Sequence, residues 1–346
     1  MLKWAREQDP PCPWDGSFGD LAISAGELEM LKWIRKRFPD CRWDERMCAA
    51  AASGGRLETL KWMRLQNPPC PWDERTCCNA AERGDLLMLT FAREQDPPCP
   101  WNEETCAHAA TSGNLEMLKW AREQNPPCPW NSRTCTYAAG EGHLEILKWA
   151  REQDPPCPWN EGICAWAASS GHLDLLKWAR LQDPPCPWDE NTCENAAKED
   201  KLAVLKWVRE QDPPCPWNEA ACLNAAIYGH YRVMKWMREQ NPPCPWNEEI
   251  CAQMARSDSF EMLKWARAQS PQCPWNEETS LHAARRGDLM VLQWLRNQDP
   301  PCPWNPGVIY KMAEMQSGSY DSESRANETV LLWMQEQPDF CPSWTC

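Results

Sequence analysis

The chain of 346 residues carries 24 Trp, 33 Pro and 22 Cys beside only five Tyr and five Phe, a bias that indicates one short phrase copied many times. Its formal net charge is −14, and because nucleic-acid-binding proteins gather Lys and Arg into a basic face, we expect no nucleic-acid partner. The sequence has no run of about 18 apolar residues and no secretory signal pattern, so it predicts no membrane insertion and a soluble, cytoplasmic protein.

A Cys-Pro-Trp phrase sets the period of the chain. Its cysteine recurs every 29 residues from Cys12 to Cys302, and the next copy, at Cys341, follows after 39. We place the ten extra residues in the polar stretch from Gln316 to Asn327. The sequence therefore predicts a single repeat solenoid over residues 1–346. It divides into a partial N-terminal repeat (1–14, second helix only), ten regular repeats (15–304) and an irregular C-terminal repeat (305–346).

Two short helices are predicted in each unit, as the residues from Pro100 to Gln124 illustrate. Asn102 is a candidate N-cap for a first helix, and Gly113 suits the turn that ends it. A second helix is predicted from Leu115 to Gln124, with a broad apolar arc that suits packing against neighbours on both sides. The prolines that follow prevent its continuation.

The turn between the two helices carries a recognisable phrase. Residues 109–116 read Ala-Ala-Thr-Ser-Gly-Asn-Leu-Glu, and a sibling reads Gly142-His143-Leu144-Glu145. This phrase resembles the core of ankyrin repeats. Together with Leu-Lys-Trp and Cys-Pro-Trp it is similar to the short, Trp-rich and Cys-rich arrays of unicellular eukaryotes and large DNA viruses. The resemblance implies an all-α, ankyrin-like repeat solenoid of about eleven helix-turn-helix units.

The chain departs from the ankyrin pattern in two places. Only a short segment, such as 125–130, links one unit to the next, so we expect the family's β-hairpin to be reduced to a loop. The Thr-Pro-Leu-His phrase of the family is also missing, and Cys106 stands at its buried Leu position.

Cysteine forms two ladders. Twelve residues follow the repeated phrase, and eight more lie seven residues later, at Cys48, Cys77, Cys106, Cys135, Cys164, Cys193, Cys222 and Cys251. Equivalent cysteines of adjacent repeats are expected too far apart for a disulfide, and a bridge within one unit, such as Cys99 to Cys106, would add little stability. The spacing is also a poor zinc pattern. We expect small buried packing residues, and no cofactor or metal site.

The remaining unusual residues follow the repeat as well. The tryptophans recur in register, so we expect them to fill the contact between repeats. The histidines share two repeat positions: His143, His172 and His230 at one, and His108 and His282 at the other. No catalytic arrangement stands out, and the sequence does not predict an enzyme.

Positions that vary between repeats nominate a binding surface, because a repeat protein keeps its framework residues constant. We predict a protein-protein interaction scaffold, a monomer or a subunit of a hetero-complex, that binds another protein on its concave face. The predicted contact residues are Glu82, Arg83, Thr111, Ser112, Trp166, Ser169, Ser170, Lys198, Glu199, Ile227, Tyr228, Arg285 and Arg286.

Two other functions stay open at this stage. The cysteine ladders allow a cysteine-rich metal-binding or redox-sensing protein. Met1 stands in register with the middle of a second helix, as Met117 does, which suggests a truncated N-terminus. On that basis the array would be the substrate-recruiting module of a larger adaptor or ubiquitin-ligase-type protein.

Overall fold

The computed structural model describes residues 23, 27–37, 43–257, 259–316 and 322–337, and the side chains of 314–316 and 322–327 are not among them. Every regular element in this part of the chain is an α-helix, so the predicted all-α repeat solenoid is confirmed. The chain divides into two compact units, residues 1–163 and 164–346, and each is described by itself. The predicted partial repeat at 1–14 lies outside the described residues, as does the centre of the predicted insertion.

The helices come in pairs that repeat along the chain. The first helices of the pairs are α4 (Glu45–Ser53), α6 (Glu74–Glu82), α8 (Glu103–Thr111), α10 (Ser132–Gly140), α12 (Glu161–Ser170), α14 (Glu190–Lys198), α16 (Glu219–Ile227), α18 (Glu248–Arg256), α20 (Glu277–Arg285) and α22 (Pro306–Gln316). The second helices are α3 (Leu28–Arg37), α5 (Leu57–Arg64), α7 (Leu86–Arg93), α9 (Leu115–Glu123), α11 (Leu144–Glu152), α13 (Leu173–Arg180), α15 (Leu202–Arg209), α17 (Tyr231–Arg238), α19 (Phe260–Arg267), α21 (Leu289–Arg296) and α23 (Ser322–Gln335).

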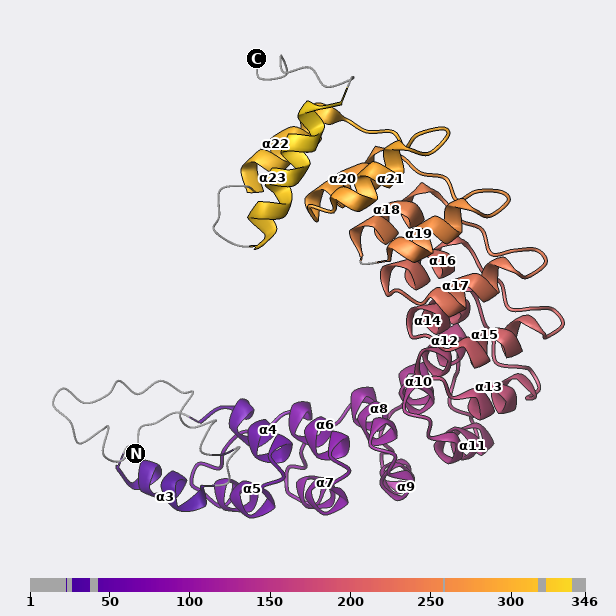
Figure 1. Cartoon of the computed structure of the whole chain (residues 1–346). Coiled ribbons are helices and arrows are strands. Elements are labelled where there is room, and N and C mark those ends of the chain that lie inside the picture. Colours follow the sequence, from indigo (N-terminus) through magenta and orange to yellow (C-terminus); the bar gives the residue numbers. More distant parts are fainter. Residues whose placement is uncertain (1–22, 24–26, 38–42, 258, 317–321, 338–346) are drawn as a thin grey trace. The chain divides into compact units, whose positions relative to one another are not determined.

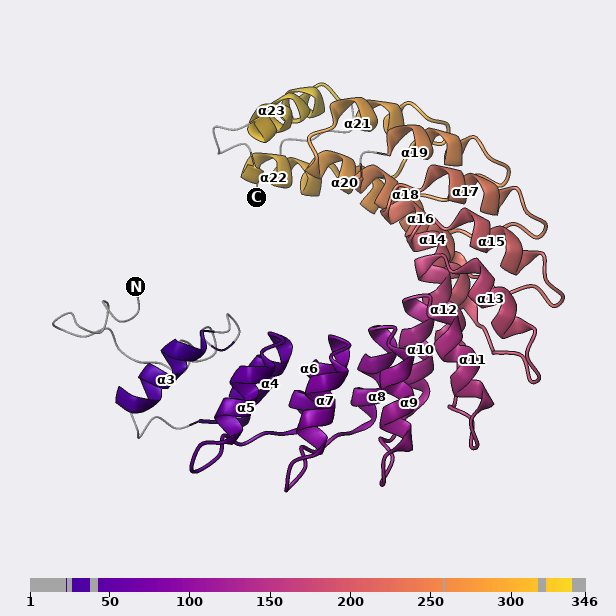
Figure 2. The ribbon, with the colours of Figure 1, turned by 90° about the horizontal axis from the view of Figure 1, so that it is seen from below.

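Within each unit the first helices form one row and the second helices another. In the first unit α4, α6 and α8 lie side by side, with α5, α7 and α9 beneath them (Figure 1), and the second unit repeats this order from α14 to α21 (Figures 1 and 2). Neighbouring first helices approach closely because small side chains face each other. Ala109 and Ala110 are at most 1 % exposed. The core of each unit therefore lies between its two rows.

Capping fixes where each first helix begins. The Asn102 side chain accepts a hydrogen bond from the backbone N–H of Glu104 at 3.0 Å, and the Thr105 hydroxyl accepts one from the Asn102 N–H. These bonds satisfy N–H groups that have no partner within the helix. The helix ends before Gly113, whose φ of +72° is unfavourable for side chains with a Cβ. The predicted cap and turn are confirmed at this repeat.

The proline loop folds back onto the helix that precedes it. The N–H of Cys128 donates to the carbonyl of Ala121 at 2.9 Å, and the Arg122 guanidinium donates to the carbonyl of Cys128 at 2.6 Å. Nine of the described loops contain a cis peptide bond before their first proline, as at Asn125-Pro126. No strand occurs in the described loops, so the hairpin of the ankyrin pattern is absent from them.

A stack of arginine and tryptophan joins consecutive repeats. The guanidinium carbon of Arg122 lies 4.2 Å from the ring centre of Trp130, and Trp130 meets Trp149 edge-on at 5.8 Å. Since Arg122 belongs to one repeat and Trp149 to the next, the stack connects the two. The tryptophans lie at the contact between repeats, as expected, and they are half-buried there. The arginine covers one face of the indole in the loop.

We expect Arg122→Lys to lower the free energy of unfolding by about 1 kcal/mol, because lysine loses both the planar stack and the forked donor. Urea unfolding followed by circular dichroism measures the change. Arg133→Lys is the matched control, since Arg133 forms a solvent-exposed ion pair with Glu104. Exposed pairs contribute little, so this control should leave the midpoint nearly unchanged. Equal effects of the two variants would refute the role of the stack.

The turn between the helices offers a second test. Gly84 adopts φ +68°, and Asp200 holds the same register with φ +56°. Gly84→Ala is expected to lower the free energy of unfolding by about 1 kcal/mol, because a Cβ is strained in this region. Asp200→Gly removes such strain and should not lower it. Urea midpoints measured side by side check both, and a neutral Gly84→Ala variant would contradict the interpretation.

Candidate functional site

The residues predicted to bind a partner lie at the C-terminal ends of the first helices, except Trp166 in the middle of α12. Most of them are exposed. Thr111, Ser112, Ser169 and Lys198 are half-buried. Because they hold equivalent repeat positions, they form one line along the row of first helices in each unit. Their exposure is compatible with contact to a partner.

Some of these side chains are already engaged in holding neighbouring repeats together. Arg83 donates to the carbonyl of Ser53 at 3.1 Å, and Arg286 donates to the carbonyl of Arg256 at 3.2 Å. The hydroxyl of Ser112 instead stays within its own repeat and donates to the carbonyl of Ala109 at 2.9 Å. Such residues serve the scaffold as well as the surface.

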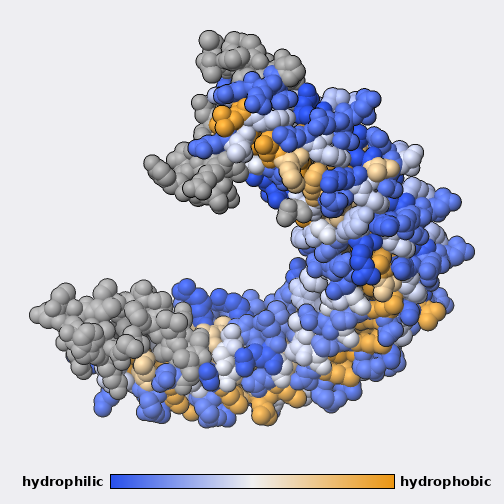
Figure 3. All heavy atoms as spheres, in the orientation of Figure 1, coloured by the Kyte–Doolittle hydropathy of each residue, from blue (hydrophilic) through white to orange (hydrophobic). Residues whose placement is uncertain are grey.

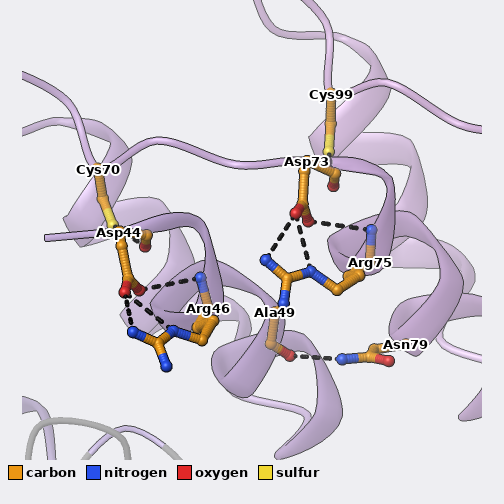
Figure 4. A network of polar contacts seen from close by, with 8 residues as sticks. All are labelled: Asp44, Arg46, Ala49, Cys70, Asp73, Arg75, Asn79 and Cys99. Atoms are coloured by element: carbon orange, nitrogen blue, oxygen red, sulfur yellow. Dashed lines mark hydrogen bonds and ion pairs between the residues drawn. The ribbon is translucent and has the colours of Figure 1, made fainter. Parts of the chain in front are cut away.

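A network at the start of α4 and α6 shows the same use of polar residues (Figure 4). The Asp44 carboxylate accepts hydrogen bonds from the backbone and the guanidinium of Arg46, and the thiol of Cys70 donates to the Asp44 carbonyl at 3.6 Å. The Asn79 amide donates to the carbonyl of Ala49 in the preceding repeat at 2.8 Å. At this end of the described chain the polar residues mostly bind one another.

An aromatic cluster lies at the end of α16 in the second unit. Ile227 is 40 % exposed and Tyr228 is 52 % exposed. The Tyr228 ring stacks on His230 with ring centres 6.2 Å apart, and the Lys198 ammonium lies 5.7 Å from the Tyr228 ring centre. The cluster therefore presents two large apolar side chains to solvent beside a cation.

Trp166 differs from the other tryptophans in its exposure. It is 52 % exposed on the first helix α12, whereas the recurring tryptophans are half-buried under arginine. Tyr231, a neighbour of the cluster in sequence, has another role. It packs edge-on against Trp265 of the next repeat at 5.4 Å, on the row of second helices.

An acidic pocket, which the sequence analysis missed, lies between the first turns of α18 and α20. It has a volume of about 440 Å³ and is lined by Asn247, Glu248, Glu249, Ala252, Gln253, Asn276, Glu278 and His282. Sequence reasoning treated His282 as a framework residue.

The sequence does contain a signal for this pocket, because two adjacent repeats carry a carboxylate at the same position, Glu249 and Glu278. At that position another pair of adjacent repeats carries Glu104 and Arg133, which form an ion pair. Asn247 also departs from the cap pattern. Its side chain makes no capping bond, and its buried Oδ1 atom has no hydrogen-bond partner.

The protonation of His282 is set by its surroundings in this pocket. Burial lowers the pKa of His282, and the charges of Arg285 and Arg256 act in the same direction. The Glu278 carboxylate, 3.9 Å from Nε2, opposes them. The balance favours the neutral imidazole, which can both donate and accept a hydrogen bond.

The cysteines are buried wherever the structure describes them. Burial raises the pKa of Cys78 to about 11, and the Cys77 thiol together with burial holds the pKa of Cys99 well above its usual range. Thiols are therefore kept protonated. Sequence reasoning weighed a contact between Cys99 and Cys106 of one repeat. The structure instead brings Cys77 to Cys99, and Cys106 to Cys128, so each first-helix cysteine contacts the loop cysteine that follows it by 22 residues.

Comparison with protein-family models and with curated proteins gives no match. Among solved structures, the chain is similar to the pentatricopeptide repeat protein PPR10 in complex with an 18-nt psaJ RNA element, with 12 % identity and a TM-score of 0.44 over 94 % of this chain. The pentatricopeptide repeat protein PPR10 from maize gives 13 % identity and a TM-score of 0.41, covering 94 % of this chain and 58 % of that one. The human ASB11 ankyrin repeat domain gives 15 % and 0.33, covering 67 % of this chain and 98 % of that domain.

The chain spans 56 % of the length of the RNA-bound PPR10 structure. A helical repeat protein in complex with RNA among the similar structures contradicts the exclusion of nucleic acid in the sequence analysis. That exclusion rested on net charge, which sums the whole chain, whereas a ligand meets one face. In the described part of the chain, no helix is long and apolar enough to cross a membrane. These likenesses concern the fold alone: the chain is an α-helical repeat solenoid, and its assignment to the ankyrin family stays a prediction.

Proposed function

We propose that this solenoid is a non-catalytic scaffold that binds another protein through its row of first helices, with Ile227 and Tyr228 as the central contact. The observation that carries the proposal is the exposure of these two side chains, 40 % and 52 %. At the same repeat positions other units carry polar or charged pairs, such as Arg285 and Arg286. Large apolar residues that break a polar pattern are candidate hot spots.

The surroundings of the cluster suggest the chemistry of the partner. Glu199 lies at the end of α14 beside Lys198, whose ammonium is 5.7 Å from the Tyr228 ring centre, whereas Glu248 and Glu249 line the pocket at the start of α18, the opposite end of the first helices. A partner that places an apolar side chain against Tyr228 and a basic side chain at the start of α18 would match both features. Charge complementarity of this kind favours encounter and orientation more than affinity.

Two of the recurring histidines connect neighbouring turns of the scaffold. His143 Nε2 lies 3.1 Å from the carbonyl of Thr111 in the preceding repeat, and His230 Nε2 lies 2.8 Å from the carbonyl of Lys198. Each of these rings ties one turn to the next. Imidazoles engaged in this way have a structural role that accounts for their recurrence.

The second-helix side carries apolar residues too, but without the same arrangement. Figure 3 shows apolar patches along the edge of the first unit where α5 and α7 lie. Leu65 and Leu181 are 83 % exposed at the ends of second helices. They are single flexible side chains without an aromatic neighbour in the contacts described, so they serve as controls for general stickiness.

The double variant Ile227→Ala, Tyr228→Ala is expected to weaken partner binding by at least about tenfold, which corresponds to about 1.4 kcal/mol. Partners retained by the unmodified chain from its native source are identified by mass spectrometry. Each is then purified and its Kd measured against both proteins. Leu181→Ala, which alters an apolar side chain of equal or greater exposure, is the matched control and should bind normally.

The same experiment separates a protein partner from RNA. The purified chain is presented with a pool of single-stranded RNA at several salt concentrations, because phosphate contacts weaken steeply with salt. RNA binding that the double variant weakens, in the absence of any protein partner, would overturn the proposal. Equal loss of binding in the double variant and in Leu181→Ala would overturn the assignment of the surface.

A further inference from the structure

Buried cysteine pairs recur along both units, and neither the helix packing nor the proposed binding surface requires two thiols at each place. One member of each pair lies on a first helix, and the other lies in the loop that follows the second helix, 22 residues later. The pairs are Cys48 with Cys70, Cys77 with Cys99, Cys106 with Cys128, Cys135 with Cys157, Cys164 with Cys186, Cys193 with Cys215, Cys222 with Cys244, and Cys251 with Cys273.

The geometry of the pairs is nearly constant. The Sγ atom of Cys106 lies 3.7 Å from the carbonyl oxygen of Cys128, and the corresponding distance is 3.9 Å for Cys77 and Cys99. Both members are at most 1 % exposed. Contact between the thiols is also the first cause of the raised pKa of Cys128. The loop thiol, that of Cys128, donates in turn to the carbonyl of Asn102 at 3.5 Å, so two buried sulfur atoms belong to residues in contact with each other.

The number of donors decides which metal ion such a place suits. Zinc in proteins takes four ligands, and in the part of the chain that the structure describes no group of three or more His, Cys, Asp or Glu side chains could hold a metal. Thiolates select soft ions, Cu(I) among them. A monovalent d¹⁰ ion, Cu(I) or Ag(I), is satisfied by two thiolates in a linear arrangement.

We propose that each pair of a first-helix cysteine and its loop cysteine is a two-coordinate site for a soft monovalent cation of the Cu(I) class. On binding, two S–H bonds break, two metal–sulfur bonds form, and two protons pass to solvent. No electron is transferred. The site then carries a net charge of −1, which must be compensated in a buried place.

An arginine beside each loop cysteine can compensate this negative charge. The Arg122 guanidinium donates to the carbonyl of Cys128 itself at 2.6 Å, and Arg267 stands in the same relation to Cys273 at 2.7 Å. The charge of Arg267 lowers the pKa of Cys251, against the larger effects of Cys273 and burial. The arginine that fixes the loop therefore also favours a negatively charged sulfur pair.

One register position provides a natural control. Opposite Cys302, the first helix α20 carries Ser280 in place of cysteine, and the Ser280 hydroxyl donates to the carbonyl of Pro303 at 2.9 Å. Serine is thus tolerated where the paired cysteine stands elsewhere. Cys78 is a second control, because it is buried beside Thr105, whose hydroxyl lies 3.5 Å from its sulfur.

Silver(I) titration of the reduced, full-length chain without oxygen tests the proposal. A small monothiol is added as a competitor, because it removes silver ions that are bound by only one protein sulfur. Bound silver is counted by mass spectrometry after gel filtration, and proton release is followed with a pH indicator. We expect two protons per ion, one ion fewer for Cys106→Ser, one more for Ser280→Cys, and no change for Cys78→Ser. Cysteines outside the described residues contribute equally to every variant.

Several results would overturn the proposal. These are one proton per ion, equal losses in Cys106→Ser and Cys78→Ser, no gain in Ser280→Cys, or silver uptake accompanied by loss of helical circular dichroism. The serine of the natural sequence at position 280 makes a folded Cys106→Ser chain the expected outcome, and circular dichroism checks it. Partner binding is measured separately, so failure here leaves the proposed scaffold function untouched.

Discussion

The shortness of the loop between repeats is the constraint on which this structure depends. A 29-residue period leaves no room for a hairpin, so the chain must turn back onto the next first helix within a few residues. The hydrogen bond from the Arg122 guanidinium to the Cys128 carbonyl, together with that from the Cys128 N–H to the Ala121 carbonyl, closes that turn. The same guanidinium then covers Trp130. The arginine of a repeat thus holds the short loop in place, where the ankyrin pattern would have the contacts of a hairpin.

This arrangement separates the framework from the surface. The loop, the arginine, the tryptophans and the cysteine pairs occupy the space between the rows and beside the second helices. The variable positions include one in the first turn of the first helices, which is occupied by Arg75, Glu104, Arg133 and Glu249 in different repeats. Changes along that line alter charge without touching the core. A repeat protein can therefore change its ligand while it keeps its stability.

The sequence was sufficient for the helices and insufficient for contacts between repeats. Caps such as Asn102 and turns such as Gly113 act locally, so their residue types predict them. The contact of Cys106 with Cys128 depends on how the loop after α9 folds back, and the sequence alone suggested only a bridge from Cys106 to Cys99, which it set aside. The exclusion of nucleic acid was wrong because net charge is a property of the whole chain. The pocket at Glu249 and Glu278 needed the register of two adjacent repeats.

The acidic pocket shows how little change such a surface needs. In the first unit Arg133 neutralises Glu104 of the preceding repeat, so an ion pair connects the two neighbouring first helices there. In the second unit the same step places Glu249 opposite Glu278, and both carboxylates line a pocket. The backbone that positions them is the same. A single exchange of charge at one register position therefore converts a contact between repeats into a surface that favours a cationic ligand group.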